Sequence, residues 1–210
     1  MNQMLTMGIA LLLGMHQPQS QKASPNAVVL KDPAHSASLI FEKSTENGSI
    51  VETETWSIGK TSRIVKSTFS ESGTLLQRMV AVTRGLSTQR TDATVSPHGA
   101  SVTSAARNGT GPTSTIALNS RESIVDPSVL WFSSDQPKVG ATIAFMSFDP
   151  EFRYWEEVSV TFDGRGKLAG SDGNLVTRKA ARSTVHMLLD DKGMPIVWEE
   201  GRFSLVRAPH

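Results

Sequence analysis

Cysteine is absent from this 210-residue chain, and its absence excludes several classes of protein. Without cysteine there can be no disulfide bond, no thiolate zinc site, no cysteine nucleophile and no lipid-modified N-terminal cysteine. Charge of one sign is also lacking, because 21 basic and 20 acidic residues leave a net charge of +1. A chain so balanced has no overall field that would draw it onto nucleic acid, so we expect no nucleic-acid partner.

Long hydrophobic runs are scarce, and the apolar run Met4–Met15 is too short to span a bilayer as a helix. Its length is typical of the apolar core of a signal peptide. We therefore predict a signal peptide and a disordered start over residues 1–23, and a single β-sheet domain over residues 24–210. A buried N-terminal helix is the alternative interpretation. Export would place the mature chain in the periplasm or outside the cell, without a transmembrane span.

Hydrophobic residues at every second position dominate the rest of the chain. Val158, Val160 and Phe162 alternate with polar residues, which predicts a strand with one buried face. Val185, Met187 and Leu189 repeat the pattern before an Asp-Asp-Lys-Gly turn, so residues 184–199 are predicted to form a hairpin. Residues 38–84 have the same spacing of strands and turns and predict an antiparallel meander.

Two other stretches have a different composition. Residues 89–120 are rich in Ser, Thr, Gly and Ala, and the short runs Ala100–Ala106 and Thr113–Asn119 predict edge or weakly packed strands. At Asp126 the chain has a typical N-cap residue followed by Pro127, and four large apolar residues come soon after. This pattern predicts one short helix, Asp126–Phe132, packed on the sheet.

Several motifs of the second half resemble a group of uncharacterised exported bacterial β-sheet domains. They are the Asp-Pro start of the short helix, Pro137–Gly140, Phe148–Pro150, Val160–Gly164 and Leu189–Glu199. This group is similar to the periplasmic lipoprotein-carrier fold, a strongly curved antiparallel sheet wrapped over one or a few short helices. The resemblance implies a curved sheet and brings no catalytic residues with it.

The patterns and the resemblance together predict a mainly β fold. We expect a curved antiparallel sheet, an open barrel or half-barrel, with about nine to eleven strands. The short helix is expected on the concave side of that sheet.

Candidate catalytic and metal-binding residues are few. The spacing of His35, His98 and His186 does not suggest a shared metal ion, so we predict no metal site and no cofactor. Acidic residues occur in close pairs, but neighbours in a strand point to opposite faces, whereas a glycosidase needs two facing carboxylates. No Gly-x-Ser-x-Gly elbow occurs. We therefore expect that the protein is not an enzyme. The acidic pairs are Asp149/Glu151, Glu156/Glu157, Asp190/Asp191 and Glu199/Glu200.

Large aromatic residues gather after residue 130, and a concave sheet lined with them could hold an apolar ligand. The alternative is that they form the core beneath the helix. The candidate ligand-binding residues are Trp131, Phe132, Phe145, Phe148, Trp155 and Trp198.

Three functions are consistent with the sequence. The first is an exported, non-catalytic binding protein for a lipid or another apolar or amphiphilic ligand, or for a protein of the cell envelope. The second is a structural or adhesive envelope module that pairs through an edge strand within residues 89–120. The third is an enzyme of unknown type, whose catalytic residues only the fold would bring together.

Overall fold

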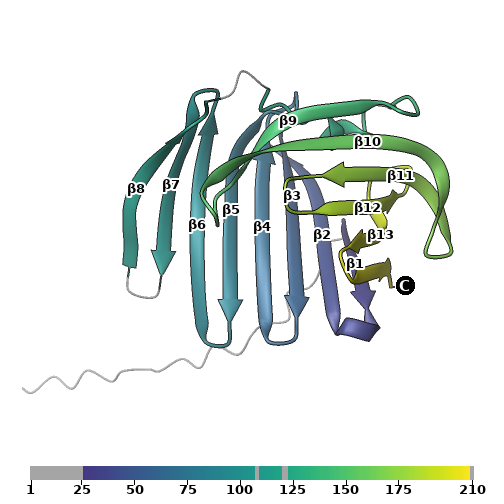
Figure 1. Ribbon diagram of the computed structural model, residues 1–210, viewed down its shortest axis with the longest axis horizontal. Coiled ribbons are helices and arrows are strands. Elements are labelled where there is room, and N and C mark those ends of the chain that lie inside the picture. The colour runs from purple at the N-terminus through teal and green to yellow at the C-terminus, as the bar shows by residue number, and fades with distance from the viewer. Residues whose placement is uncertain (1–25, 107–108, 120–122, 209–210) are drawn as a thin grey trace, which may run out of the picture.

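The computed structural model describes residues 26–106, 109–119 and 123–208 (Figure 1). The predicted signal peptide lies outside the described residues. Within them, no helix is long and apolar enough to cross a membrane. The regular structure is almost entirely β, as predicted, and its strands are β1 (Ala27–Asp32), β2 (Ala37–Glu46), β3 (Ser49–Ile58), β4 (Thr61–Phe69), β5 (Leu75–Arg84), β6 (Ser87–Ser96), β7 (Gly99–Ala106), β8 (Gly109–Ala117), β9 (Thr142–Asp149), β10 (Tyr154–Leu168), β11 (Ser171–Lys179), β12 (Thr184–Leu189), β13 (Pro195–Glu200) and β14 (Phe203–Arg207).

All fourteen strands belong to one antiparallel sheet, with the order β8-β7-β6-β5-β4-β3-β2-β1-β14-β13-β12-β11-β10-β9. Strands that follow one another in sequence pair with each other, except β8 and β9, and β1 also pairs with β14 through Leu30 and Arg207. The sheet remains open, with β8 and β9 at its two edges. In Figure 1, β2–β8 form an upright wall and β9–β13 run across it, so the C-terminal half of the sheet lies over the N-terminal half.

The alternation predicted from the sequence determines which face of each strand is buried. Val158, Val160 and Phe162 of β10 are buried, whereas Glu157 and Asp163 are exposed. The hairpin of β12 and β13 and the meander of β2–β5 also form as predicted. A β-bulge between Phe162 and Gly164 interrupts the long strand β10, and bulges of this kind bend a strand and increase its twist.

The structure has more strands than the nine to eleven expected, because β1, β6 and β11 form in addition to the predicted ones. In the Ser/Thr-rich stretch, β7 and β8 correspond to the two predicted short runs, and β6 is the additional strand. Strands β6, β7 and β8 carry small side chains but pair over most of their length. Thr103 and Thr113 lie opposite each other, and their hydroxyl groups are 2.8 Å apart. Cross-strand pairs of this kind stabilise a sheet that has few large side chains to bury.

The predicted helix is much shorter than expected. Only Pro127–Leu130 is helical, as a single 3₁₀ turn labelled η2. Its start agrees with the prediction, because Asp126 is the N-cap and accepts a hydrogen bond from the Ser128 N–H at 3.0 Å. Trp131 already has an extended backbone, so the turn ends there. A second 3₁₀ turn, η1 (Pro33–His35), connects β1 and β2.

Three apolar clusters form the core, and the first two hold the two halves of the sheet together. One joins the inner faces of β4–β7 to Phe148 of β9 and Val129 of η2. A second surrounds Leu30, Leu39 and Trp198 near the pairing of β1 with β14. The third contains Phe132 and its neighbours on β9–β11. The space between these clusters is not filled with side chains.

Candidate functional site

A cavity of about 1160 Å³ lies between the two halves of the sheet. Strands β2–β5 line one side of it and β9–β13 line the other. Exposed side chains from several turns and strand ends border the cavity and mark its mouth, and they are Ile58, Arg84, Phe152, Arg182 and Arg202.

The opposite end of the cavity is covered by the segment around η2, where Val129 and Trp131 line it. Lys43 of β2 donates a hydrogen bond to the Val129 carbonyl oxygen. On the other side, Gly193 lies directly against the Trp131 carbonyl oxygen. The segment therefore spans from the first half of the sheet to the second at this end.

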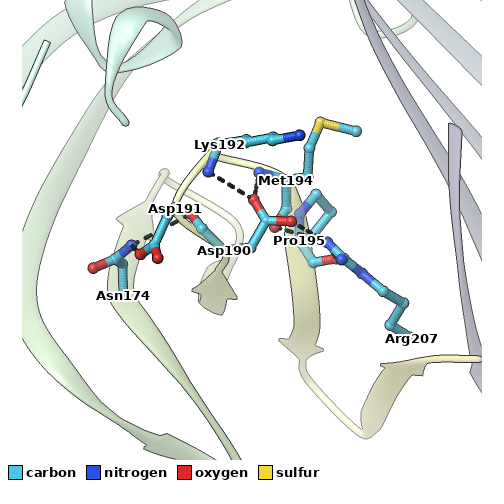
Figure 2. Close-up of polar contacts among 7 residues, drawn as sticks. All are labelled: Asn174, Asp190, Asp191, Lys192, Met194, Pro195 and Arg207. Carbon is cyan, nitrogen blue, oxygen red and sulfur yellow. Dashed lines mark hydrogen bonds and ion pairs between the residues drawn. The ribbon is translucent and has the colours of Figure 1, made fainter. Parts of the chain in front are cut away.

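A network of polar contacts holds the β12–β13 turn at this covered end (Figure 2). One carboxylate oxygen of Asp190 accepts hydrogen bonds from the N–H groups of Lys192 and Met194, both at 2.9 Å. The other oxygen accepts from Arg207 of β14 at 3.0 Å. Arg207 also donates to the Pro195 carbonyl oxygen at 2.8 Å. The pair Asp190/Asp191 thus lies in a turn, as the sequence predicts, and Asp190 also anchors the last strand.

The walls of the cavity combine apolar and charged residues. They are formed by alternate residues of neighbouring strands, which face the same side of the sheet. The main apolar lining residues are Phe41, Trp56, Val65, Val80, Val82, Val160, Val176, Val185, Met187 and Trp198.

Charged residues also face the cavity, and two of the cations have carboxylate partners. Lys43 pairs with Glu52 across β2 and β3, with 3.1 Å between the charged atoms. Arg63 pairs with Glu151 of the β9–β10 turn at 3.0 Å. These pairs largely cancel their own charge.

Arg78 of β5 is held by neutral groups. Its Nε donates to Ser67 Oγ at 3.0 Å, and its Nη1 donates to Ser147 Oγ at 2.7 Å and to the Phe148 carbonyl oxygen at 3.0 Å. The side chain therefore bridges β5 and β9. Burial, aided by the nearby charge of Arg178, lowers the pKa of Arg78 to about 10.

Two carboxyl groups of the cavity have raised pKa values. Burial raises the pKa of Glu54, which accepts a hydrogen bond from Trp56 Nε1 at 3.3 Å. Burial also raises the pKa of Asp126 to about 6, although its hydrogen bond with Ser128 acts in the opposite direction. The charge of Arg178 lowers the pKa of both groups, so Arg178 lies within electrostatic range of both.

The six predicted ligand-binding aromatic residues are not all at the cavity. Trp131 and Trp198 line it. Phe132 and Phe145 are buried in one cluster with Phe162. Phe148 is buried in another cluster, where Trp155 packs against it. These last four residues form the core beneath β9 and β10, which is the alternative that the sequence left open for them.

The histidines and acidic pairs are dispersed. His35 pairs with Asp32 at 2.8 Å beside η1, and the Nδ1 of His186 lies 3.2 Å from Thr177 Oγ1. Asp149 caps the β9–β10 turn by accepting from the Glu151 and Phe152 N–H groups. In the described part of the chain, no three His, Asp or Glu side chains group as ligands for a metal ion.

Sequence reasoning did not identify Glu54, Arg78 and Arg178 as cavity residues. The available signal is the alternation in Val51–Trp56, which puts Glu52, Glu54 and Trp56 on one face of β3. Both faces of that strand mix polar and apolar residues, so the alternation alone does not show which face is inside.

Comparison with known proteins identifies no relative of this chain. No family model matches the chain, and no curated protein or solved structure is significantly similar to it.

Proposed function

We propose that the protein is an extracytoplasmic, non-catalytic binding protein that holds an amphiphilic molecule in the cavity between the two halves of its sheet. The observation that carries this proposal is the cavity of about 1160 Å³ with valine-rich walls. Pockets for small molecules typically measure about 300–1,000 Å³ and are mostly apolar with a few polar groups. The apolar run Met4–Met15 supports the extracytoplasmic location.

The charged residues of the cavity favour an amphiphile over a plain hydrocarbon. Glu54, Arg78 and Arg178 line it together with the valines. A hydrocarbon ligand would remove water from these groups without replacing it, and that loss is costly. A ligand with both an apolar chain and a polar head fits both kinds of lining.

The partners of the polar groups support a non-catalytic role. Asp149 and Asp126 cap turns. Glu156 accepts a hydrogen bond from the Tyr154 hydroxyl at 3.3 Å, and Glu157 is exposed. A hydrogen bond within the fold or exposure to solvent therefore explains the position of each of these carboxyl groups without a catalytic role.

Filling the cavity tests this function. In β4, Val65 lines the cavity, whereas the adjacent Ile64 points to the opposite face of the sheet. We expect Val65→Trp to weaken binding of dodecyl maltoside, a detergent with an uncharged head, at least about tenfold by occupying its space. Ile64→Trp is the matched control and should bind like the wild type. The measurement is isothermal titration calorimetry below the critical micelle concentration.

Purification gives an independent check. Native mass spectrometry of the exported protein, followed by organic extraction, should detect a co-purified lipid-sized mass that is reduced in Val65→Trp. If the natural protein carries no such mass and binds no dodecyl amphiphile, the proposed function is wrong.

The free edge of the sheet supports a second candidate, an envelope module that pairs through β8. Leu118 N–H donates to the His98 carbonyl oxygen at 3.1 Å. Because alternate residues of an antiparallel strand bond to the same neighbour, the Thr115 N–H points away from β7. Such an edge can add a strand from another chain. Sedimentation velocity would then detect self-association that Thr115→Pro abolishes.

A further inference from the structure

Arg178 extends into the cavity from an apolar part of its wall. It lies on β11, opposite Val160 of β10 on one side and Val185 of β12 on the other. All three residues line the cavity. The wall itself therefore offers the guanidinium group no polar neighbour across either strand pair.

The other cations of the inner cavity have hydrogen-bonded or ion-paired protein partners, whereas among the described residues Arg178 has only electrostatic neighbours at longer range. Lys43 and Arg63 pair with carboxylates, and Arg78 donates to neutral oxygens. Across residues 26–106, 109–119 and 123–208, the structure gives Arg178 no hydrogen bond and no ion pair. A guanidinium group carries five N–H donors, and leaving them without acceptors in a partly buried site is unfavourable.

Arg78 is the second positive charge of this region. The charge of Arg178 lowers the pKa of Arg78, so the two guanidinium groups repel each other across the cavity. Arg78 has only neutral acceptors, which leaves its charge without a counter-ion in contact. The carboxyl groups near Arg178, those of Glu54 and Asp126, both have raised pKa values and neutralise this charge less readily than exposed carboxylates would.

We propose that Arg178, together with Arg78, binds the anionic head of the amphiphile, while its apolar chain lies against the valine walls of the cavity. The head would be a carboxylate or a phosphate monoester, because a guanidinium group binds both through paired N–H···O contacts. This inference rests on the proposed function and names the class of ligand.

Probes that share one chain and differ in the head test the proposal. Dodecyl phosphate, dodecyl maltoside and dodecyltrimethylammonium are titrated below their critical micelle concentrations into the full mature chain. Wild type should bind dodecyl phosphate at least about tenfold more tightly than dodecyl maltoside, and the trimethylammonium probe most weakly. Inorganic phosphate should bind much more weakly than dodecyl phosphate, because it has no apolar chain.

Substitution of Arg178 gives the decisive comparison. Arg178→Gln should weaken binding of dodecyl phosphate about tenfold and leave binding of dodecyl maltoside within about twofold of wild type. The matched control is Lys179→Gln, since Lys179 is the exposed neighbour on the opposite face of β11. It removes the same charge from the chain and should bind dodecyl phosphate like the wild type. Near-UV circular dichroism checks that both variants are folded.

The failure of this inference is distinguishable from failure of the proposed function. Equal affinity of wild type and Arg178→Gln for dodecyl phosphate, with dodecyl maltoside still bound, would overturn the anion site alone. Binding of inorganic phosphate as tight as that of dodecyl phosphate would overturn the amphiphile and leave a simple oxyanion site. If no dodecyl probe binds, the proposed function fails and this inference fails with it.

Discussion

Asp126 has two roles with opposite effects on its protonation. As the cap of η2, its carboxylate accepts a hydrogen bond from the Ser128 N–H, which favours the ionised form. The same side chain is buried beside the cavity, and burial favours the neutral form. Burial has the larger effect, because the pKa of Asp126 is raised to about 6.

This shift predicts a pH-dependent contribution to stability. Between pH 3.8, the ordinary value, and about 6, the folded chain binds a proton at Asp126 that the unfolded chain does not. The contribution is therefore fully present below pH 3.8 and is lost as the pH rises through 6. A shift of this size corresponds to about 3 kcal/mol. Asp126→Asn keeps an oxygen that can accept the cap hydrogen bond and does not titrate.

Urea denaturation at pH 4.5 and pH 7.5 measures the effect. Other groups titrate in this range too, so the informative quantity is the difference in pH dependence between wild type and Asp126→Asn. We expect wild type to lose more stability than the variant between the two pH values. An identical pH dependence in the two proteins would contradict the shift.

At the scale of elements, the segment around η2 depends on its contact with the β4–β5 turn. Asp126 N–H donates to the Gly73 carbonyl oxygen at 2.8 Å, and Leu75 N–H donates to the Ile124 carbonyl oxygen at 3.3 Å. Thr74 and Val125 form a single bridge between these hydrogen bonds. The segment is thus bound to the sheet by its backbone before its side chains cover the end of the cavity.

Gly73→Ala should detach this segment. Gly73 has a φ of +84°, and a Cβ there would overlap the Asp126 carbonyl oxygen. Gly85→Ala is the matched control, because Gly85 has a φ of +60° and open space around it. Each substitution adds about 1–2 kcal/mol of left-handed strain, and only Gly73→Ala adds the overlap.

We expect Gly73→Ala to lower the free energy of unfolding by about 2 kcal/mol more than Gly85→Ala does. Urea midpoints of the two variants measure this difference. Hydrogen exchange at the Asp126 N–H should become faster in Gly73→Ala alone. Equal midpoints would mean that the segment contributes little to stability.

The elements also show what the sequence could predict. Alternation predicted strands such as β10 and β12, because each buries one face and its apolar residues lie at every second position. It failed for the length of the helix because the apolar residues of 129–132 serve two different clusters. Val129 packs with Phe69, whereas Trp131 and Phe132 pack with Phe145. Side chains that pack into different clusters do not form one helical face. Their closeness in the sequence does not show that they point in different directions.

The candidate site was less predictable than the strands. Trp131 and Trp198 were identified from their aromatic character alone. Arg178 looks like a surface residue in the sequence, since it is a charged residue between Thr177 and Lys179. Its position in a cavity wall arises only because the second half of the sheet lies over the first, and no local pattern encodes that arrangement.

At the scale of the whole molecule, the first and last strands lie side by side in the middle of the sheet. Lys31 of β1 lies between Ser38 of β2 and Val206 of β14. The sheet consists of two meanders, β1–β8 and β9–β14, in each of which successive strands pair. The β1–β14 pair joins these two meanders into one sheet. Loss of this pair would leave the two walls of the cavity in contact through side chains alone.

Two proline substitutions compare the middle of the sheet with its edge. Lys31 and Thr115 are both exposed, so replacing either side chain removes little packing. Lys31→Pro removes an N–H between two paired strands, and we expect a loss of about 3 kcal/mol or more. Thr115→Pro removes an N–H that points away from β7 and should cost about 1 kcal/mol or less. Thermal or urea unfolding measures both, and equal losses would contradict the observed strand order.

The pairing of β1 with β14 also sets the order of events as the chain is made. Each meander consists of hairpins between sequence neighbours, which close over short distances and form fast. The pairing of Leu30 with Arg207 closes a loop that contains nearly the whole chain. It cannot form until β14 has been synthesised. Until then no strand pairing joins the two walls, and the sheet around the cavity is incomplete. A chain exported as proposed would therefore cross the membrane without cargo and acquire its ligand only after its last strand has arrived.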